Sequence, residues 1–432
     1  MESLPNEILE KIFSYCTHKD LVQSIQNVCS WWREVAQSAS VWQHFEYCPK
    51  HNTSSEQIVE MLKLSPKLQN MVLKNKYDDR ILQAITENCA ELRKLEIESP
   101  ADIDLKFIEN LQGKCPKVEF LRIPHQFLTD CGDVGKFTNL KVLLLTGSQM
   151  KNLEINLEPL ANNCKKLERL EFLSTNFKMN DLRYLLSMRQ DTLRTLGISC
   201  CNMFGECVLP ALSTCDLRSL SLFFYGACER HYNKIDNFER LKTVRVLTIR
   251  NFYDDDSDRV KQYADVAQLM ELRLYGYHFE DDIIKIIVKK CPVLNHLALI
   301  SSMKITDASL MIIRKCKELC SLNIFCNNCV SDTGIIHLHH VQSLKYLRIA
   351  WCSNLTKQGY VNILKLSSLR ALNLELQDLA EFPWDLIPIQ MNNLRHLGIY
   401  RCNNVDRSAV EELKRRFTGL SVDIWWCRVR AA

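Results

Sequence analysis

Glycine is scarce in this sequence, with 12 residues in a chain of 432, and this scarcity argues against a glycine-rich loop that cradles phosphate groups. The phosphate-loop pattern G-x-x-x-x-G-K-[ST], the metalloprotease pattern H-E-x-x-H and the nucleophile pattern G-x-S-x-G are all absent. We therefore expect a protein that is not an enzyme and that needs no cofactor.

Long apolar runs and a strong charge excess are missing as well. No stretch approaches the roughly 18 apolar residues of a membrane span, and the opening MESLPNEILEKIF has no basic segment leading into an apolar run, as a secretory signal would. The net charge of +4 is small for this length, which argues against nucleic-acid and membrane-surface partners. We expect a protein of the cytoplasm, the nucleus or both.

Most of the chain is filled by a repeat with the pattern L-x-x-L-x-L, as in LRKLEI from Leu92 and LRHLGI from Leu394. We identify 14 copies, and the last seven start 25 residues apart. Such a regular period is typical of a solenoid, in which a long chain does not need one compact core. The copies start at Leu68, Leu92, Val118, Leu140, Leu167, Leu193, Leu217, Val244, Leu269, Leu294, Leu319, Leu344, Leu369 and Leu394.

Each copy combines a short strand with a helix. The alternating leucines predict a strand that buries one face. In ITDASLMIIRKC (305–316), Thr306 or Asp307 can cap a helix whose Leu310 and Ile313 face the same way as the strand leucines. We therefore predict an α/β fold, a leucine-rich-repeat solenoid with a curved parallel sheet backed by helices. It would cover residues 68–432 and end in a capping strand.

Cysteine is abundant, with 20 residues, and without a secretory route we expect free thiols. Many of them keep a fixed place in the repeat, where a small, weakly polar side chain packs well. These positions are Cys89, Cys115, Cys164, Cys291 and Cys316 before the first repeat residue, and Cys201, Cys352 and Cys402 after it.

Two clusters could bind a metal ion. CNNCVSDTGIIHLHH (326–340) loosely resembles a zinc site, but the repeat places Cys326 after a strand and the histidines on the opposite helix. The acidic run YDDDSD (253–258) fits a solvated turn better than a cation site. We expect no bound metal.

Residues 1–45 follow a different pattern, which predicts three short helices. Pro5 suits the first turn of the first helix, and THKD (17–20) is a capping sequence for the second, in which we expect Leu21, Ile25 and Val28 to lie inside. A unit of this size buries too little surface to be comfortably stable alone. Its surplus apolar side chains can pack on the first repeat or form a docking surface. The predicted apolar positions are Ile8, Leu9, Ile12, Phe13, Leu21, Ile25, Val28, Trp31, Trp32, Val35 and Ala36.

The stretch 4–45 resembles an F-box, whose pattern runs L-P-x-E-[IL]-[IL], then I-[FL], then V-C-x-x-W-R and a final W. Trp32 falls on the tryptophan of that pattern, whereas Trp31 replaces a residue that is usually basic. Cys16 and Thr17-His18 also depart from it. With the repeats, the chain resembles the F-box and leucine-rich-repeat protein family. We assign residues 1–47 to the F-box and 48–67 to a connecting helix that enters the solenoid.

The resemblance implies a substrate-recognition subunit of an SCF-type cullin–RING ubiquitin ligase, present in one copy per complex. The F-box would bind the Skp adaptor, which links to the cullin scaffold, and the repeats would hold a protein target for ubiquitination and proteasomal degradation. The alternative is a non-catalytic binding or inhibitory scaffold that acts without the ligase. The residues implied for adaptor binding are Leu4, Pro5, Ile8, Leu9, Ile12, Val28, Cys29, Trp31, Trp32 and Trp42.

A target surface is expected on the concave face of the sheet, where residues two, four and six positions after each first repeat residue point outward. Seven Lys or Arg and five Asp or Glu occupy these positions, a near balance that argues against a nucleic-acid groove. Aromatic residues and arginines are the usual binding hot spots, unless here they only stack on one another. The candidates are Phe223, Arg250, Arg273, Tyr275, Phe325, Tyr346, Arg348 and Tyr400.

Overall fold

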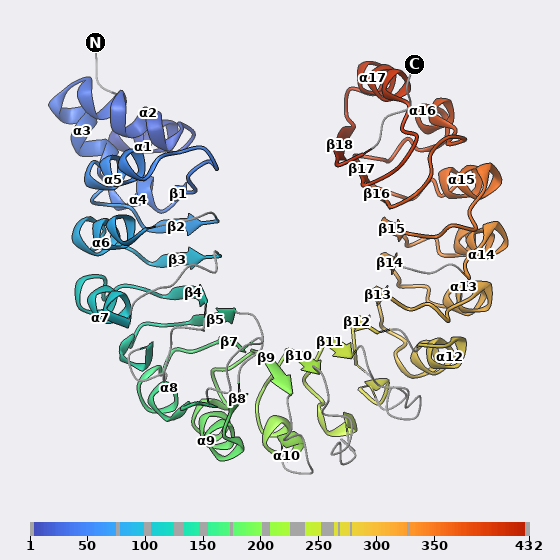
Figure 1. Cartoon of the computed structure of the whole chain (residues 1–432), viewed down its shortest axis with the longest axis horizontal. Helices are drawn as coiled ribbons and strands as arrows, with labels where there is room; N and C mark the ends of the chain where they lie inside the picture. The colour runs from blue at the N-terminus through green and yellow to red at the C-terminus, as the bar shows by residue number, and fades with distance from the viewer. Residues whose placement is uncertain are drawn as a thin grey trace. The chain divides into compact units, whose positions relative to one another are not determined.

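The computed structural model describes most of the chain in two compact units. The first is Met1–Ser199 with Thr214–Asp216, and the second is Cys200–Ser213 with Leu217–Ala432. In both units the strands lie side by side with the helices along one side of them (Figure 1). The described residues are 4–74, 78–98, 105–124, 134–146, 154–172, 176–200, 208–224, 238–251, 263–266, 268–276, 279–325 and 329–427.

The first unit begins with short helices and continues as alternating strands and helices. The helical start consists of α1 (Asn6–Phe13), α2 (His18–Gln23), the 3-10 turn η1 (Ile25–Asn27), α3 (Ser30–Ala36) and α4 (Ala39–Trp42). The parallel sheet is formed by β1 (Glu46–Tyr47), β2 (Asn70–Leu73), β3 (Lys94–Ile97), β4 (Phe120–Pro124), β5 (Val142–Thr146), β7 (Arg169–Phe172) and β9 (Thr195–Cys200). The connecting helices are α5 (Ser55–Lys63), α6 (Asp79–Asn88), α7 (Leu105–Lys114), η3 (Val134–Lys136), α8 (Glu158–Asn163) and α9 (Met179–Arg189). A separate small sheet pairs β6 (Glu154–Ile155) with β8 (Asn176–Phe177).

The second unit repeats the same alternation more regularly. Its parallel strands are β10 (Ser219–Phe224), β11 (Val246–Asn251), β12 (Glu271–Tyr275), β13 (His296–Ile300), β14 (Ser321–Phe325), β15 (Tyr346–Ala350), β16 (Ala371–Glu375), β17 (His396–Tyr400) and β18 (Ser421–Trp425). Its helices are α10 (Val208–Ser213), η5 (Phe238–Arg240), α12 (Asp281–Lys290), α13 (Asp307–Ile313), α14 (Asp332–His337), η6 (Leu338–His340), α15 (Lys357–Leu364), η7 (Trp384–Leu386), α16 (Ile387–Gln390) and α17 (Arg407–Arg416).

The predicted leucine-rich-repeat architecture is confirmed. Every predicted copy contains a strand that begins two residues after its first repeat residue, as β3 does after Leu92. Neighbouring strands pair in parallel without a register shift, so Leu297, Leu322 and Leu347 are successive partners, and each is buried. Among the described residues no helix is long and apolar enough to cross a membrane.

The sheet begins earlier than the repeat pattern indicates. Glu46 and Tyr47 of β1 pair with Asn70 and Met71 of β2. The first strand therefore lies inside the segment assigned to residues 1–47, and the helical start is continuous with the sheet.

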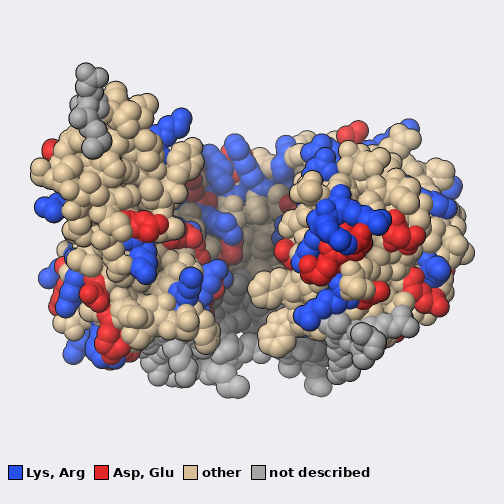
Figure 2. All heavy atoms as spheres, turned by 90° about the horizontal axis from the view of Figure 1, so that it is seen from above, with Lys and Arg blue, Asp and Glu red and all other residues tan. Residues whose placement is uncertain are grey.

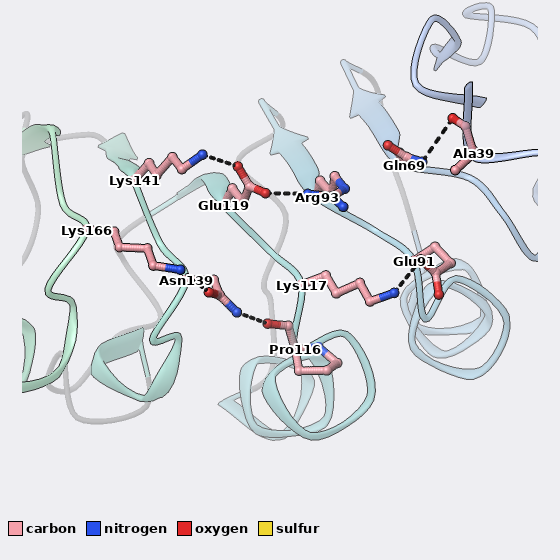
Figure 3. Close-up of polar contacts among 10 residues, drawn as sticks. All are labelled: Ala39, Gln69, Glu91, Arg93, Pro116, Lys117, Glu119, Asn139, Lys141 and Lys166. Atoms are coloured by element: carbon pink, nitrogen blue, oxygen red, sulfur yellow. Dashed lines mark hydrogen bonds and ion pairs between the residues drawn. The ribbon is translucent and has the colours of Figure 1, made fainter. Parts of the chain in front are cut away.

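Polar contacts between neighbouring repeats run along the first unit (Figure 3). Glu119 accepts from Arg93 at 2.5 Å and from Lys141 at 2.7 Å, which links three successive repeats just before their strands. Lys117 donates to Glu91 of the preceding repeat at 2.6 Å. Such exposed ion pairs contribute about 0–1 kcal/mol each to the free energy of unfolding. The buried strand leucines, which pair from repeat to repeat, therefore provide most of the stability.

Aspartates at helix N-termini tie successive repeats of the second unit together. Asp307, the first residue of α13, accepts from the backbone N–H of Ser331 at 2.8 Å and from its hydroxyl at 2.6 Å. Desolvation raises the pKa of Asp307, but the hydrogen bonds from Ser331 and its neighbours outweigh this and hold the pKa below its ordinary value. Asp332 makes the same two bonds to Thr356 of the next repeat.

We expect Gly334→Ala to destabilise the chain by about 2–3 kcal/mol, because it crowds this carboxylate. A Cβ at position 334 would lie 2.2 Å from Oδ1 of Asp307, which is held in place by its bonds to the next helix. The midpoint of thermal unfolding measures the effect. The control is Gly113→Ala in α7, where a Cβ meets nothing within 4 Å and the change should stabilise by up to about 1 kcal/mol. Equal unfolding midpoints in the two variants would show that the contacts of Asp307 with the next repeat tolerate an added methyl group.

The cysteines at fixed repeat positions are packing residues, as predicted. The seven of them that the structure describes are all buried, and Cys201 lies outside the described residues. Burial raises the pKa of Cys89, Cys164 and Cys291 to about 12, so these thiols stay protonated. The Cys115 thiol donates to the Cys89 carbonyl one repeat earlier, at 3.3 Å.

Parts of the two candidate metal clusters, Cys326 and residues 253–258, lie outside the described residues. Of the described members, Cys329 donates its thiol to the Met303 carbonyl at 3.4 Å, and His339 Nε2 lies 2.8 Å from the Asn362 carbonyl. Within the described part of the chain, no group of three or more metal-binding side chains is brought together.

Candidate protein-interaction sites

The N-terminal helices are built around a small apolar core. Thr17 caps α2 by accepting from the backbone N–H of Asp20 at 3.1 Å, as the capping sequence predicts. Leu9 and Phe13 of α1 and Leu21 of α2 are buried. The core fixes the helices so that other apolar side chains of this segment face outward.

These outward-facing side chains form an exposed apolar set, which consists of Leu4, Ile8, Ile12 and Val28. Ile8 and Ile12 lie one turn apart on α1 and are 45% and 46% exposed. Leu4 is 50% and Val28 59% exposed. The expectation that Val28 lies inside is wrong, because α2 ends at Gln23 and the 3-10 turn η1 changes the helical phase before Val28. In Figure 2 the lobe at the left shows few charged side chains in its upper part, whereas acidic and basic side chains gather in its lower part.

The adjacent tryptophans of α3 hold it against α1. The Trp32 ring lies 5.3 Å from the Phe13 ring in an edge-to-face arrangement, and Trp31 Nε1 donates to Asn6 Oδ1 at 2.9 Å. Both indoles are half-buried. Cys29 is exposed, and its sulfur accepts from the Trp32 backbone N–H at 3.4 Å at the start of α3.

Two residues implied for adaptor binding are core residues instead. Leu9 is 2% and Trp42 0% exposed, so neither side chain offers surface to a partner. Adjacent apolar residues on one helix point about 100° apart, and the core takes Leu9 while Ile8 stays outside. Pro5 precedes α1 and is exposed.

His18 joins the N-terminal helices to the first repeats. Its ring stacks on Tyr47 of β1 at 4.7 Å, and its Nε2 lies 3.1 Å from the Ser65 hydroxyl after α5. Desolvation lowers the pKa of His18 to about 4, so the ring is neutral near pH 7. His18 therefore ties the N-terminal helices to the first repeats, while Leu4, Ile8, Ile12 and Val28 remain exposed.

Three of the candidate target-binding residues stack on one another. Phe223, Arg250 and Tyr275 are register partners on β10, β11 and β12. The Arg250 guanidinium carbon lies 5.2 Å from the Phe223 ring and 4.4 Å from the Tyr275 ring, in cation–π geometry. Phe223 is only 7% exposed, so it supports Arg250 and has little surface left for a partner.

The other candidates of the second unit are more accessible. Arg348 forms an ion pair with Glu375 and lies 5.6 Å from the Phe325 ring, and Arg273 pairs with Glu271. The Tyr346 side chain is 47% exposed.

Tyr400 is half-buried because its ring lies over Gly398. A Cβ at Gly398 would approach the Tyr400 ring to 2.4 Å, so any larger residue there would displace the ring.

Cationic side chains on the strands of the first unit are engaged with acids. Lys94 binds Glu46 at 2.6 Å and Glu96 at 2.8 Å. Arg122 lies 3.2 Å from Glu98. Acids therefore neutralise these cations within the unit itself, and the better supply of aromatic rings beside arginines lies in the second unit.

Comparisons with known proteins find one matching family model and similar solved structures. Residues 1–47 match the sequence model of the F-box-like family. No curated protein sequence matches the chain. Among solved structures, an internalin from Listeria monocytogenes is similar with a TM-score of 0.42 and 16% identity, over 83% of this chain and 93% of the internalin. The yeast Rad7 and Elc1 complex is similar with a TM-score of 0.43 and 14% identity, over 98% of this chain and 89% of the matched chain. This chain thus has an F-box-like segment at its N-terminus, followed by a parallel leucine-rich-repeat sheet.

Proposed function

We propose that this chain is the substrate-recognition subunit of an SCF-type cullin–RING ubiquitin ligase. The F-box-like segment would bind a Skp-type adaptor, and the strand face of the repeats would bind a protein target. The observation that carries the proposal is the exposed apolar set Leu4, Ile8, Ile12 and Val28 within the segment that matches the F-box-like family. Ile8 and Ile12 lie one turn apart on α1, and exposed apolar side chains that lie together mark interaction surfaces in soluble proteins.

In this role the chain makes and breaks no bond. It holds the target beside the subunits that transfer ubiquitin, and that proximity converts a slow encounter into a local reaction. The repeat sheet suits the task because a rigid surface loses little conformational entropy when it binds.

The second candidate is a binding or inhibitory scaffold that acts without the ligase. The pairing of β1 with β2 and the contact of His18 with Ser65 favour it, because a helical cap on the solenoid would make the same contacts. A cap does not need the exposed apolar set, however, so we favour the ligase subunit.

Size-exclusion chromatography with light scattering separates the two candidates. We expect the purified full chain and a purified Skp-type adaptor to form a one-to-one complex that also recruits the cullin scaffold. If the chain elutes alone, while the same adaptor preparation binds another F-box protein, the scaffold function replaces our proposal. The full chain is required because a cut after residue 47 would remove β1 from the sheet and His18 from Ser65.

A further inference from the structure

A hollow of about 300 Å³ opens on the strand face of the second unit, over β12 to β15. Four residues of one cross-strand row shape it, because Arg273, Ala298, Asn323 and Arg348 are successive register partners. Two short side chains thus lie between two long ones. With strands about 4.8 Å apart, the backbones of the two arginines are separated by roughly 14 Å.

Each arginine of the hollow is held by an acid and still has donors to offer. Arg273 donates through Nε to Glu271, and Arg348 donates through Nη2 to Glu375. A guanidinium has five N–H donors in a fixed plane, and neither arginine has a further acceptor among the described residues. The side chains are 51% and 37% exposed, so a ligand can reach them.

The remaining polar lining is compatible with an acceptor-rich ligand. His296, Ser321 and Asn323 can each donate or accept, Asn323 Oδ1 has no partner among the described residues, and Glu271 is the only carboxylate among the lining residues. Glu271 and Glu375 balance the charges of the two arginines. The hollow would therefore select its ligand by hydrogen-bond geometry more than by long-range electrostatic attraction. A cationic side chain entering here would meet two guanidinium groups.

We propose that this hollow binds an anionic side chain, a carboxylate or a phosphate, of a peptide segment in the target protein. The inference rests on the proposed function, because it assigns the chemistry by which that target is recognised. Tyr275 and Ile300 line the same hollow and provide apolar contact for the neighbouring part of the peptide.

Selection from a random-peptide display library on the immobilised full chain tests the proposal. We expect Asp or Glu to be enriched at one position of the selected peptides. The test variant changes both pairs, Arg273→Gln with Glu271→Gln and Arg348→Gln with Glu375→Gln, so that no half-buried carboxylate loses its partner and the net charge is unchanged. The selected peptides should bind this variant about tenfold more weakly or worse, as expected for a lost charge-assisted contact.

The matched control is Arg245→Gln with Arg395→Gln. These arginines belong to the same unit but donate to the backbone carbonyls of Lys242 and Asn392, outside the hollow. The control should bind the selected peptides like the unchanged chain. Both variants should keep the unfolding midpoint and the adaptor binding of the unchanged chain, which separates a failure of this inference from a failure of the proposed function.

A second library that contains phosphoserine distinguishes the two anions. Enrichment of Asp or Glu over phosphoserine assigns a carboxylate, and the reverse assigns a phosphate. Three results would overturn the inference: no enrichment of Asp, Glu or phosphoserine in either library, peptides that bind the test variant undiminished, or single-stranded RNA that binds the full chain more tightly than any selected peptide and loses this binding in the test variant.

Discussion

The double variant Ile8→Asp, Ile12→Asp will lose binding to a Skp-type adaptor by a factor of at least about 100. Both side chains are close to half exposed and lie one turn apart on α1. Burying an isoleucine fully against a partner contributes about 1.5–3 kcal/mol, and a carboxylate in an apolar interface adds a desolvation cost. Because each side chain is already about half buried, the lost burial is about half of that value per position. Desolvating two carboxylates at about 1–3 kcal/mol each raises the total above about 2.7 kcal/mol, which corresponds to a 100-fold loss.

The fold should survive this change, because neither isoleucine belongs to the buried core. Surface substitutions usually alter stability by about 0.5 kcal/mol or less, so the unfolding midpoint should stay near that of the unchanged chain. Isothermal titration against the adaptor measures the loss of affinity. The control is Met303→Asp with Ile336→Asp in the second unit, two side chains of similar exposure at 47% and 45%. Undiminished binding by the α1 variant would place the adaptor on another surface.

The sequence predicts the repeats well, because their signal is local and recurs. Each copy carries its own strand leucines, and a constant 25-residue period from Val244 to Leu394 leaves one possible register between neighbouring strands. That register is present in the structure, where Leu272 pairs with Leu297 and Leu297 with Leu322. Strand β1 gives no such signal, since Glu46-Tyr47 is a strand only through its pairing with the residues of β2.

The N-terminal segment is predicted in outline but not residue by residue. Leu9 and Ile8 are equally apolar, and only the packing of α1 against the other helices decides which is buried. The position of Val28 depends on the 3-10 turn that ends the second helix, and no apolar period announces that turn. Sequence patterns thus identify the docking segment, whereas tertiary packing decides which of its side chains remain exposed.

The sequence predicts the target-binding strand face better than the N-terminal segment but less completely than the repeats. Arginines and aromatic rings can be placed in rows from the repeat period alone, and so can the short residues Ala298 and Asn323 between Arg273 and Arg348. The hollow is not among the sequence predictions, although this arrangement of long and short side chains was its signal. The direction in which each guanidinium turns depends on Glu271 and Glu375, and only the structure shows these pairings.

The three tryptophans of the N-terminal segment should differ sharply when each is changed to alanine. Trp42→Ala should cost about 3–5 kcal/mol, because this side chain is fully buried and its removal leaves a large cavity. Its ring contacts those of His18 at 5.6 Å and Phe45 at 5.9 Å, so the cavity would open beside the junction with the first repeat. Differential scanning calorimetry of the full chain measures the loss.

The other two tryptophans provide the contrast. Trp32→Ala should cost less than Trp42→Ala, since the indole is half-buried and its ring contact is with Phe13. Trp31→Ala removes one hydrogen bond to Asn6, worth about 0.5–1.5 kcal/mol, and should weaken adaptor binding more than folding because it frees the start of α1. Equal destabilisation by all three changes would mean that the segment has one undivided core. It would also remove the distinction between the residues that support α1 and those that α1 offers to the adaptor.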